Sequence, residues 1–159
     1  MASGIELYDR WSAVSREFAG EWALAEACSG RRWTFAQLAQ EAQERPGPDD
    51  GKPVAYPEGM GADFIVDLLS AWRRGQVTCP VEAGGARPDF VTLPAECVHL
   101  KLTSATTGVP RAVAFGASQL AADVDQIMAG MGLDRRWANL ACISLAHSYG
   151  FSNLVLPLV

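Results

Sequence analysis

The sequence predicts an α/β fold with a parallel or mixed sheet and flanking helices. A strand, a helix and a second strand follow one another between residues 54 and 81, which is the order of a βαβ crossover with parallel strands. A hydroxyl-rich segment at 103–111 directly follows an apolar strand at 97–102, where ligand-binding loops lie in such sheets. The 159 residues are enough for one domain with a sizeable core.

Composition excludes several classes of protein. The chain is 49% hydrophobic with a net charge of −5 and has no basic run, which argues against nucleic acid as a partner. No apolar segment is long enough to span a membrane, and no signal peptide precedes the first helix, so we expect a cytoplasmic protein. Four dispersed cysteines and two histidines favour structural thiols over disulfides, and give no support for a metal site.

The first third of the chain contains two helices. Apolar residues spaced three and four apart predict a helix over 5–18, followed by a short strand within 22–28 and a tight turn. A second helix begins after Thr34, which forms a capping box with Gln37. Three prolines and two glycines at 45–53 then require a loop.

The βαβ unit consists of a strand at 54–56, a helix at about 61–74 and a strand at 77–81. The helix is expected to end at Arg73, Arg74 and Gly75. Positive charges in the last turn suit the helix dipole, and a glycine just beyond suits the C-terminal cap. The residues 82–96 form a connector.

The last third adds further strands and one helix. The segment 112–115 alternates weakly, as a strand returning from the hydroxyl loop would. Ser118 is a candidate cap for the next helix, whose methionines and leucines are expected to pack in the core. The run 139–146 predicts a buried strand that places His147 at its carboxyl end.

The segment 103–111 suits a phosphate. Short hydroxyl donors, a glycine and Arg111 can surround an anion, although a plain polar turn is an equally good interpretation from composition alone. It is not a P-loop, since the pattern G-x-x-x-x-G-K-[S/T] is absent.

His147 and Ser148 form the second polar group that follows a strand. If the two strands are neighbours, His147 faces the same crevice as the hydroxyl loop, although a lone histidine in such a place is more often structural. A serine hydrolase is a poor alternative, because adjacent residues cannot readily pair as nucleophile and base and no G-x-S-x-G is present.

Four segments, in order, resemble motifs of the adenylate-forming enzymes, the AMP-dependent synthetases and ligases. Residues 102–111 (LTSATTGVPR) resemble their phosphate-binding signature. Residues 33–38 are similar to an early T-Y-x-E-L element, and 71–81 to a helix, x-A-G-A, strand and P-L element. Residues 144–151 (SLAHSYGF) resemble the P-x-x-H-x-x-G element. Together they identify the chain as similar to this family over about 120 residues.

The resemblance implies an ATP-dependent ligase that converts a carboxylic acid into an acyl-adenylate and then into a thioester of coenzyme A or carrier-protein pantetheine. His147 would orient the carboxylate, and so act as the catalytic residue by positioning rather than by proton transfer. Mg²⁺ would accompany ATP, with its acidic ligand outside this chain. The phosphate ligands carried over by motif are Thr103, Ser104, Thr106, Thr107, Gly108 and Arg111, and the acyl pocket residues are His147, Ser148, Tyr149 and Gly150.

At several positions the sequence differs from the family's motifs. Ala105 and Ala112 stand where the family usually has glycine, Arg111 replaces a lysine, and the connector 82–96 is short. The chain also lacks the family's later segments, so we expect residues 1–159 to be an incomplete N-terminal part of the large AMP-binding domain, inactive alone and prone to self-association through an apolar C-terminus. The alternative is a non-catalytic module of the same fold that binds a nucleotide or a protein.

Overall fold

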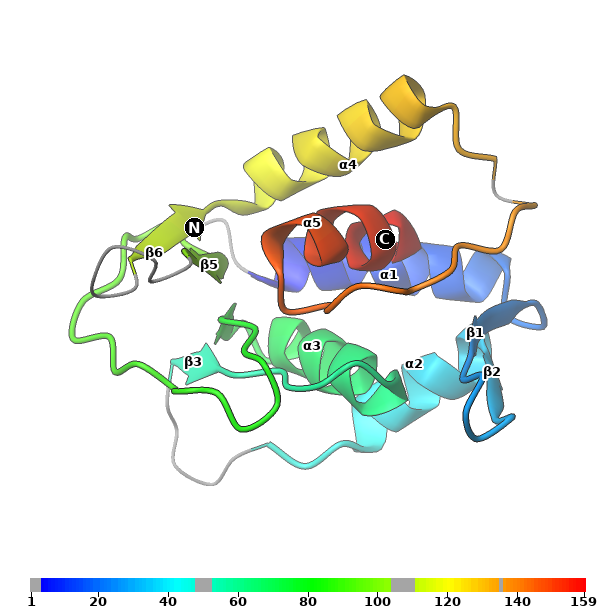
Figure 1. The fold of residues 1–159 in the computed structure, drawn as a ribbon, viewed down its shortest axis with the longest axis horizontal. Helices are drawn as coiled ribbons and strands as arrows, with labels where there is room; N and C mark the ends of the chain where they lie inside the picture. The colour runs from blue at the N-terminus through cyan, green and yellow to red at the C-terminus, as the bar shows by residue number, and fades with distance from the viewer. Residues whose placement is uncertain (1–3, 48–52, 104–110, 135) are drawn as a thin grey trace.

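The computed structural model describes residues 4–47, 53–103, 111–134 and 136–159 (Figure 1). Its elements are α1 Gly4–Glu17, β1 Trp22–Ala25, β2 Arg32–Thr34, α2 Phe35–Glu44, β3 Val54–Ala55, α3 Ala62–Arg73, β4 Val77–Thr78, β5 His99–Leu102, β6 Ala112–Phe115, α4 Ala117–Met131 and α5 Ser148–Gly150. A π-helical turn, Phe151–Val155, and a 3-10 turn, Leu156–Leu158, extend α5, and we call 148–158 the C-terminal helix.

The mixed sheet has the order β3-β4-β5-β6 in the described part of the chain. Strands β3, β4 and β5 are parallel, with Val54 opposite Val77 and Thr78 opposite His99. The predicted βαβ crossover is therefore confirmed. Strand β6 runs antiparallel to β5, with Leu102 opposite Ala112, which confirms the predicted return strand.

The N-terminal elements follow their local signals. The Thr34 hydroxyl accepts from the Gln37 backbone N–H at 3.2 Å, and the Gln37 side chain accepts from the Thr34 N–H at 2.9 Å, so the predicted capping box is confirmed. Strands β1 and β2 pair as an antiparallel hairpin. Its turn residue Glu26 accepts from the Ala62 N–H at 2.9 Å and thereby caps α3, whose own N-cap is a glycine.

Strand β5 separates two differently packed faces. Leu100 joins the cluster of Val54, Val77, Cys79 and Cys97, against which Phe90 and Leu93 of the connector pack. The other face carries His99 and Lys101 and meets the helices, because successive side chains of a strand point to opposite sides. Figure 1 shows β3, β5 and β6 at one end of the molecule and the hairpin of β1 and β2 at the other.

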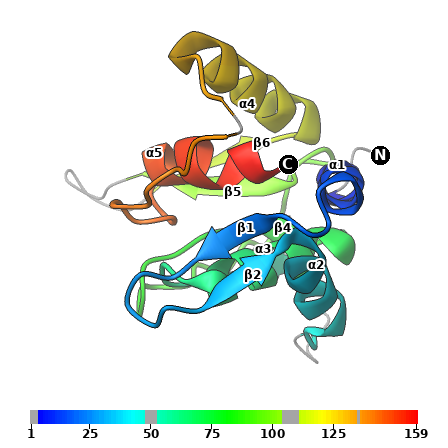
Figure 2. The same ribbon diagram turned by 90° about the vertical axis from the view of Figure 1, so that its right-hand side faces the viewer.

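Phe151 joins the C-terminal helix to this face. Its ring stacks on His99 with centroids 4.0 Å apart and meets Trp72 of α3 edge-on at 6.5 Å. Phe151, Val155 and Leu156 are buried, so the expectation of an exposed apolar C-terminus is wrong for these residues. A helix can direct its apolar side toward neighbouring helices without needing strand partners. Figures 1 and 2 show the C-terminal helix between α4 and α3. Self-association stays a prediction.

Two other expectations are wrong. The segment 139–146 is not a strand but an extended, largely exposed connection, with Leu140 78% exposed. An apolar run becomes a strand only where another strand supplies a hydrogen-bonded ladder, and no described strand pairs with it. The N-cap of α4 is Gly116 rather than Ser118, because the Gln119 side chain accepts from the Gly116 N–H at 2.8 Å.

Cys79 and Cys97 are free and buried, as expected for structural thiols. Burial raises the pKa of the Cys79 thiol to about 11, so it stays protonated near neutrality. In the described ranges, none of the helices is both long and apolar enough to cross a membrane.

Replacing Thr34 by alanine should lower the free energy of unfolding by about 1 kcal/mol, because the first turn of α2 loses its side-chain acceptor. Urea denaturation of T34A and T34S measures this effect. The serine variant keeps the hydroxyl and should stay near the parent, and equal losses in both variants would contradict the capping role.

His99 should make the fold sensitive to acid. It is fully buried, with its Nδ1 2.9 Å from the Thr78 hydroxyl, and burial lowers its pKa from 6.5 to about 3. The folded state therefore holds the neutral ring, and the stability this provides is present above the unfolded pKa and lost as the pH falls from about 6.5 toward 3. Between about pH 7 and 5 the parent should lose roughly 2 kcal/mol more than H99Q.

Denaturation of H99Q and H147Q at both pH values tests this assignment. His147 is the exposed histidine and provides the comparison, so the stability lost between the two pH values should be smaller in H99Q than in H147Q. The same slope in the parent and H99Q would show that carboxylates alone cause the acid sensitivity.

Candidate functional site

The hydroxyl loop starts and ends at neighbouring backbone positions. Beyond the β5–β6 ladder, the Thr103 N–H donates to the Arg111 carbonyl at 2.8 Å, and the Arg111 N–H donates to the Thr103 hydroxyl oxygen at 3.0 Å. The two described ends of the loop, Thr103 and Arg111, are thus held together at the end of the β5–β6 hairpin. Thr103 and Arg111 are exposed there, so a ligand of the loop can reach both.

The other predicted phosphate ligands, Ser104, Thr106, Thr107 and Gly108, lie outside the described residues, as does Ala105. Ala112 is the first residue of β6, and no described residue other than glycine has a positive φ. Alanine is therefore compatible with the backbone at position 112.

A tight turn presents His147. The His147 N–H donates to the Ser144 carbonyl at 3.3 Å, and its own carbonyl accepts from Phe151 at 2.8 Å. Its Nδ1 accepts from the Tyr149 N–H at 3.3 Å, which places the ring proton on Nε2 when the imidazole is neutral. The turn therefore leaves a ring N–H as a donor at an exposed position.

Gly150 is required by the same turn. A Cβ at position 150 would lie 1.9 Å from the Ser144 carbonyl oxygen, closer than any real contact. Gly150 is buried and does not border the hollow described next. The structure thus supplies a packing reason for this glycine, and its predicted place in the substrate site stays a prediction.

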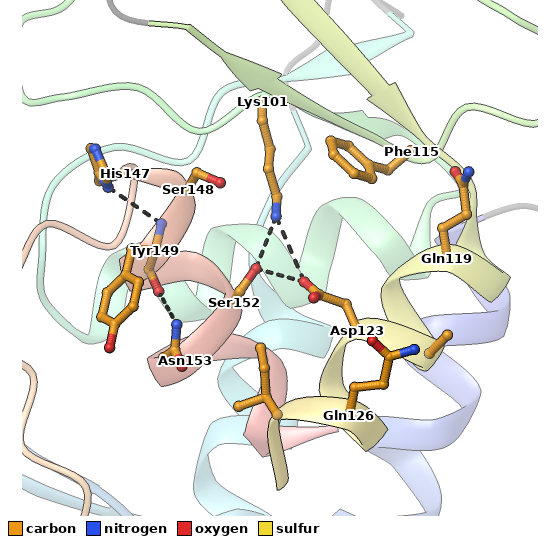
Figure 3. Close-up of a pocket in the computed structure, with 12 residues that line it drawn as sticks. Lys101, Phe115, Gln119, Asp123, Gln126, His147, Ser148, Tyr149, Ser152 and Asn153 are labelled. Atoms are coloured by element: carbon orange, nitrogen blue, oxygen red, sulfur yellow. Dashed lines mark hydrogen bonds and ion pairs between the residues drawn. The ribbon is translucent and has the colours of Figure 1, made fainter. Parts of the chain in front are cut away.

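An open hollow of about 690 Å³ lies between β5, α4 and the C-terminal helix (Figure 3). Of the predicted substrate residues, His147, Ser148 and Tyr149 line it. The predicted phosphate ligands Thr103 and Arg111 do not. Sequence reasoning missed the rest of its lining: Lys101, Phe115, Gln119, Ala122, Asp123, Gln126, Ile127, Ser152 and Asn153.

Three of these missed residues form a polar network. Lys101 donates from Nζ to the Ser152 hydroxyl at 2.8 Å, and Ser152 donates to Asp123 Oδ2 at 2.7 Å. The Lys101 ammonium also lies 3.8 Å from that oxygen and 4.8 Å from the centre of the Phe115 ring. Burial lowers the pKa of Lys101, and Asp123 opposes this shift. The network ties β5, α4 and the C-terminal helix together.

One signal of this network was present in the sequence. Lys101 interrupts an apolar strand, and a charged residue at such a position needs a partner. Its partners, Asp123 and Ser152, could not be identified from the sequence, because they lie far from Lys101 along the chain. Among the described residues, no three His, Cys, Asp or Glu side chains gather closely enough to hold a metal ion.

No family model matches the sequence, and a search of curated proteins found no relative. Solved structures do match. VinN superposes with a TM-score of 0.76 at 16% identity, over 95% of this chain and 53% of VinN. The N-terminal subdomain of Klebsiella oxytoca NpsA gives a TM-score of 0.66 at 16% identity, over 92% and 50%. ATP-bound MatB from Rhodopseudomonas palustris gives 0.66 at 16% identity, over 92% and 43%.

These neighbours are adenylate-forming enzymes, and the chain has the fold of their N-terminal part. The likeness confirms the fold expected from the four motif-like segments. The chain spans about half the length of these structures.

Substituting Gly150 by alanine should destabilise the fold by about 2 kcal/mol or more, because the new methyl group has to displace the Ser144 carbonyl. Gly130 provides a matched control within α4. A Cβ there meets nothing within 4 Å, so G130A should leave stability unchanged or raise it by up to about 1 kcal/mol. Thermal denaturation compares the two variants, and a G150A protein as stable as the parent would contradict the close packing.

Proposed function

We propose that this chain provides the phosphate loop and part of the acid-binding site of an ATP-dependent carboxylic acid ligase. The observation that supports this most strongly is the hairpin closure between Thr103 and Arg111, at the carboxyl end of β5, in the fold of the N-terminal part of adenylate-forming enzymes. A hydroxyl-rich segment with a cation at its end suits a triphosphate.

In the proposed reaction a carboxylate oxygen attacks the α-phosphorus of ATP. A C–O–P bond forms, the bond to the β-phosphate oxygen breaks, and pyrophosphate leaves with its negative charge. The guanidinium of Arg111 and the hydroxyls of Thr103, Ser104, Thr106 and Thr107 would stabilise that charge. The described residues contain no candidate set of Mg²⁺ ligands, so the proposal assigns no metal ligand to this chain.

His147 would position the carboxylate. Since Nδ1 accepts from the Tyr149 N–H, the neutral ring can donate from Nε2 to one carboxylate oxygen and direct the other toward the nucleotide. This role needs no change in protonation of the ring. Ser148 and Tyr149 would contact the remainder of the acid, since both border the hollow.

The neighbours support the coarse features of this reaction. MatB was solved with ATP, VinN with 3-methylaspartate, and NpsA also as an artificial adenylation–PCP fusion with ThdA. By analogy, we infer that the acyl group passes to a thiol, on coenzyme A or on carrier-protein pantetheine. Turnover would require residues that the neighbours have and this chain does not span, so ATP–pyrophosphate exchange by the 159 residues alone would contradict this part of the proposal.

Arg111 should be needed for nucleotide binding. Isothermal titration of ATP into the purified chain should give an affinity that falls by about tenfold or more in R111M, because a charge-assisted contact to phosphate is lost. R16M removes an equivalent charge from exposed Arg16 of α1 and should bind like the parent.

Absence of ATP binding by the parent, or equal binding by R111M, would contradict the phosphate loop. ATP binding without exchange in a longer protein that carries the remaining domain would instead favour the non-catalytic module.

A further inference from the structure

Lys101 is the only cation among the described residues that line the hollow, and its ammonium is already engaged. It donates to Ser152, lies beside Asp123 Oδ2 and faces the Phe115 ring (Figure 3). Its side chain is only 12% exposed. A second carboxylate on a ligand would therefore compete with Asp123 for the charge of Lys101.

Asp123, unlike Lys101, has a polar atom that no described residue contacts by a hydrogen bond. Both of its contacts, with Ser152 and with Lys101, use Oδ2, and no hydrogen bond within the described residues reaches Oδ1. The side chain is 40% exposed and held in place from one side (Figure 3). The network thus fixes the orientation of a carboxylate and leaves one oxygen accessible from the hollow.

A ligand group that lies against Asp123 would cover that oxygen. Burying a carboxylate oxygen without a donor is costly, whereas an ammonium group would supply both a donor and the opposite charge. The charges of Lys101 and Asp123, the two charged side chains of the lining, cancel each other. A positively charged ligand group is therefore favoured only where it contacts Asp123.

Other lining groups are polar as well. Gln126 lies one turn beyond Asp123 on α4, and Asn153 donates to the Tyr149 carbonyl at 2.8 Å, which leaves its amide oxygen as an acceptor. An alkyl chain would cover these groups without pairing with them.

We propose that Asp123 binds the amino group of the acid, so that the substrate class is amino carboxylic acids rather than fatty or dicarboxylic acids. This inference rests on the proposed function, because His147 at the rim of the hollow would take the carboxylate of the same molecule. Lys101 and Ser152 then act as positioning residues that hold Asp123.

Ligand-observed NMR on the purified chain, without nucleotide, tests the preference. The probes are leucine against isocaproate and phenylalanine against hydrocinnamate, pairs that differ only in the amino group, with glutarate as the dicarboxylate. Each amino acid should bind at least about tenfold more tightly than its deaminated partner and than glutarate.

The variant D123N keeps the shape and can still accept from Ser152, and it should lose this preference. D125N is the matched control on the same helix, since Asp125 pairs with Arg10 at 3.5 Å and does not line the hollow. Equal binding within the pairs, an unchanged preference in D123N, or no binding of any probe at millimolar concentration would overturn the inference.

Titration of ATP into the same samples separates this result from the proposed function. ATP binding without an amino-acid preference overturns only the role of Asp123. An amino-acid preference that D123N abolishes, in a chain that does not bind ATP, overturns only the ligase proposal.

Discussion

The alternation of side chains along β5 determines where the rest of the structure can lie. Leu100 points into one cluster, while His99 and Lys101 point to the helices. His99 holds the C-terminal helix by stacking on Phe151, and Lys101 holds the next residue, Ser152, by a hydrogen bond. A one-residue shift of this strand would exchange the two faces and separate both contacts.

Polar residues at such positions reduce stability unless each finds a partner. His99 contacts Thr78 and remains neutral, while Lys101 remains paired with Asp123 and Ser152. Buried polar groups of this kind specify one packing arrangement, because a helix in any other register would leave them unpaired. The hollow is therefore shaped by the same contacts that secure the C-terminal helix.

The elements that the sequence predicted correctly depend on local signals. The capping box of Thr34, the βαβ crossover and the hairpin around 103–111 each arise from residues close together in the chain. The predictions that were wrong or missing concern residues whose partners lie far away in the sequence. The run 139–146 has the apolar pattern of a strand but no described ladder partner, and Lys101 could not be matched to Asp123 or Ser152 from spacing alone. His147, Ser148 and Tyr149 border the hollow and belong to a motif-like segment, whereas the charged network beside them carries no motif.

The predicted residues of the candidate site come from short segments of the sequence, whereas the missed ones come from several elements. Lys101, which lines the hollow, lies in β5, and Thr103, where the loop closes, directly follows the end of that strand, so the position of β5 sets their separation. The turn that presents His147 continues into Phe151, whose ring is fixed in the core. Residues that would meet groups common to every substrate, phosphate and carboxylate, thus lie in short continuous segments of the sequence, where a motif can be recognised. Those that would distinguish one acid from another lie on α4 and the C-terminal helix, where only packing brings them together.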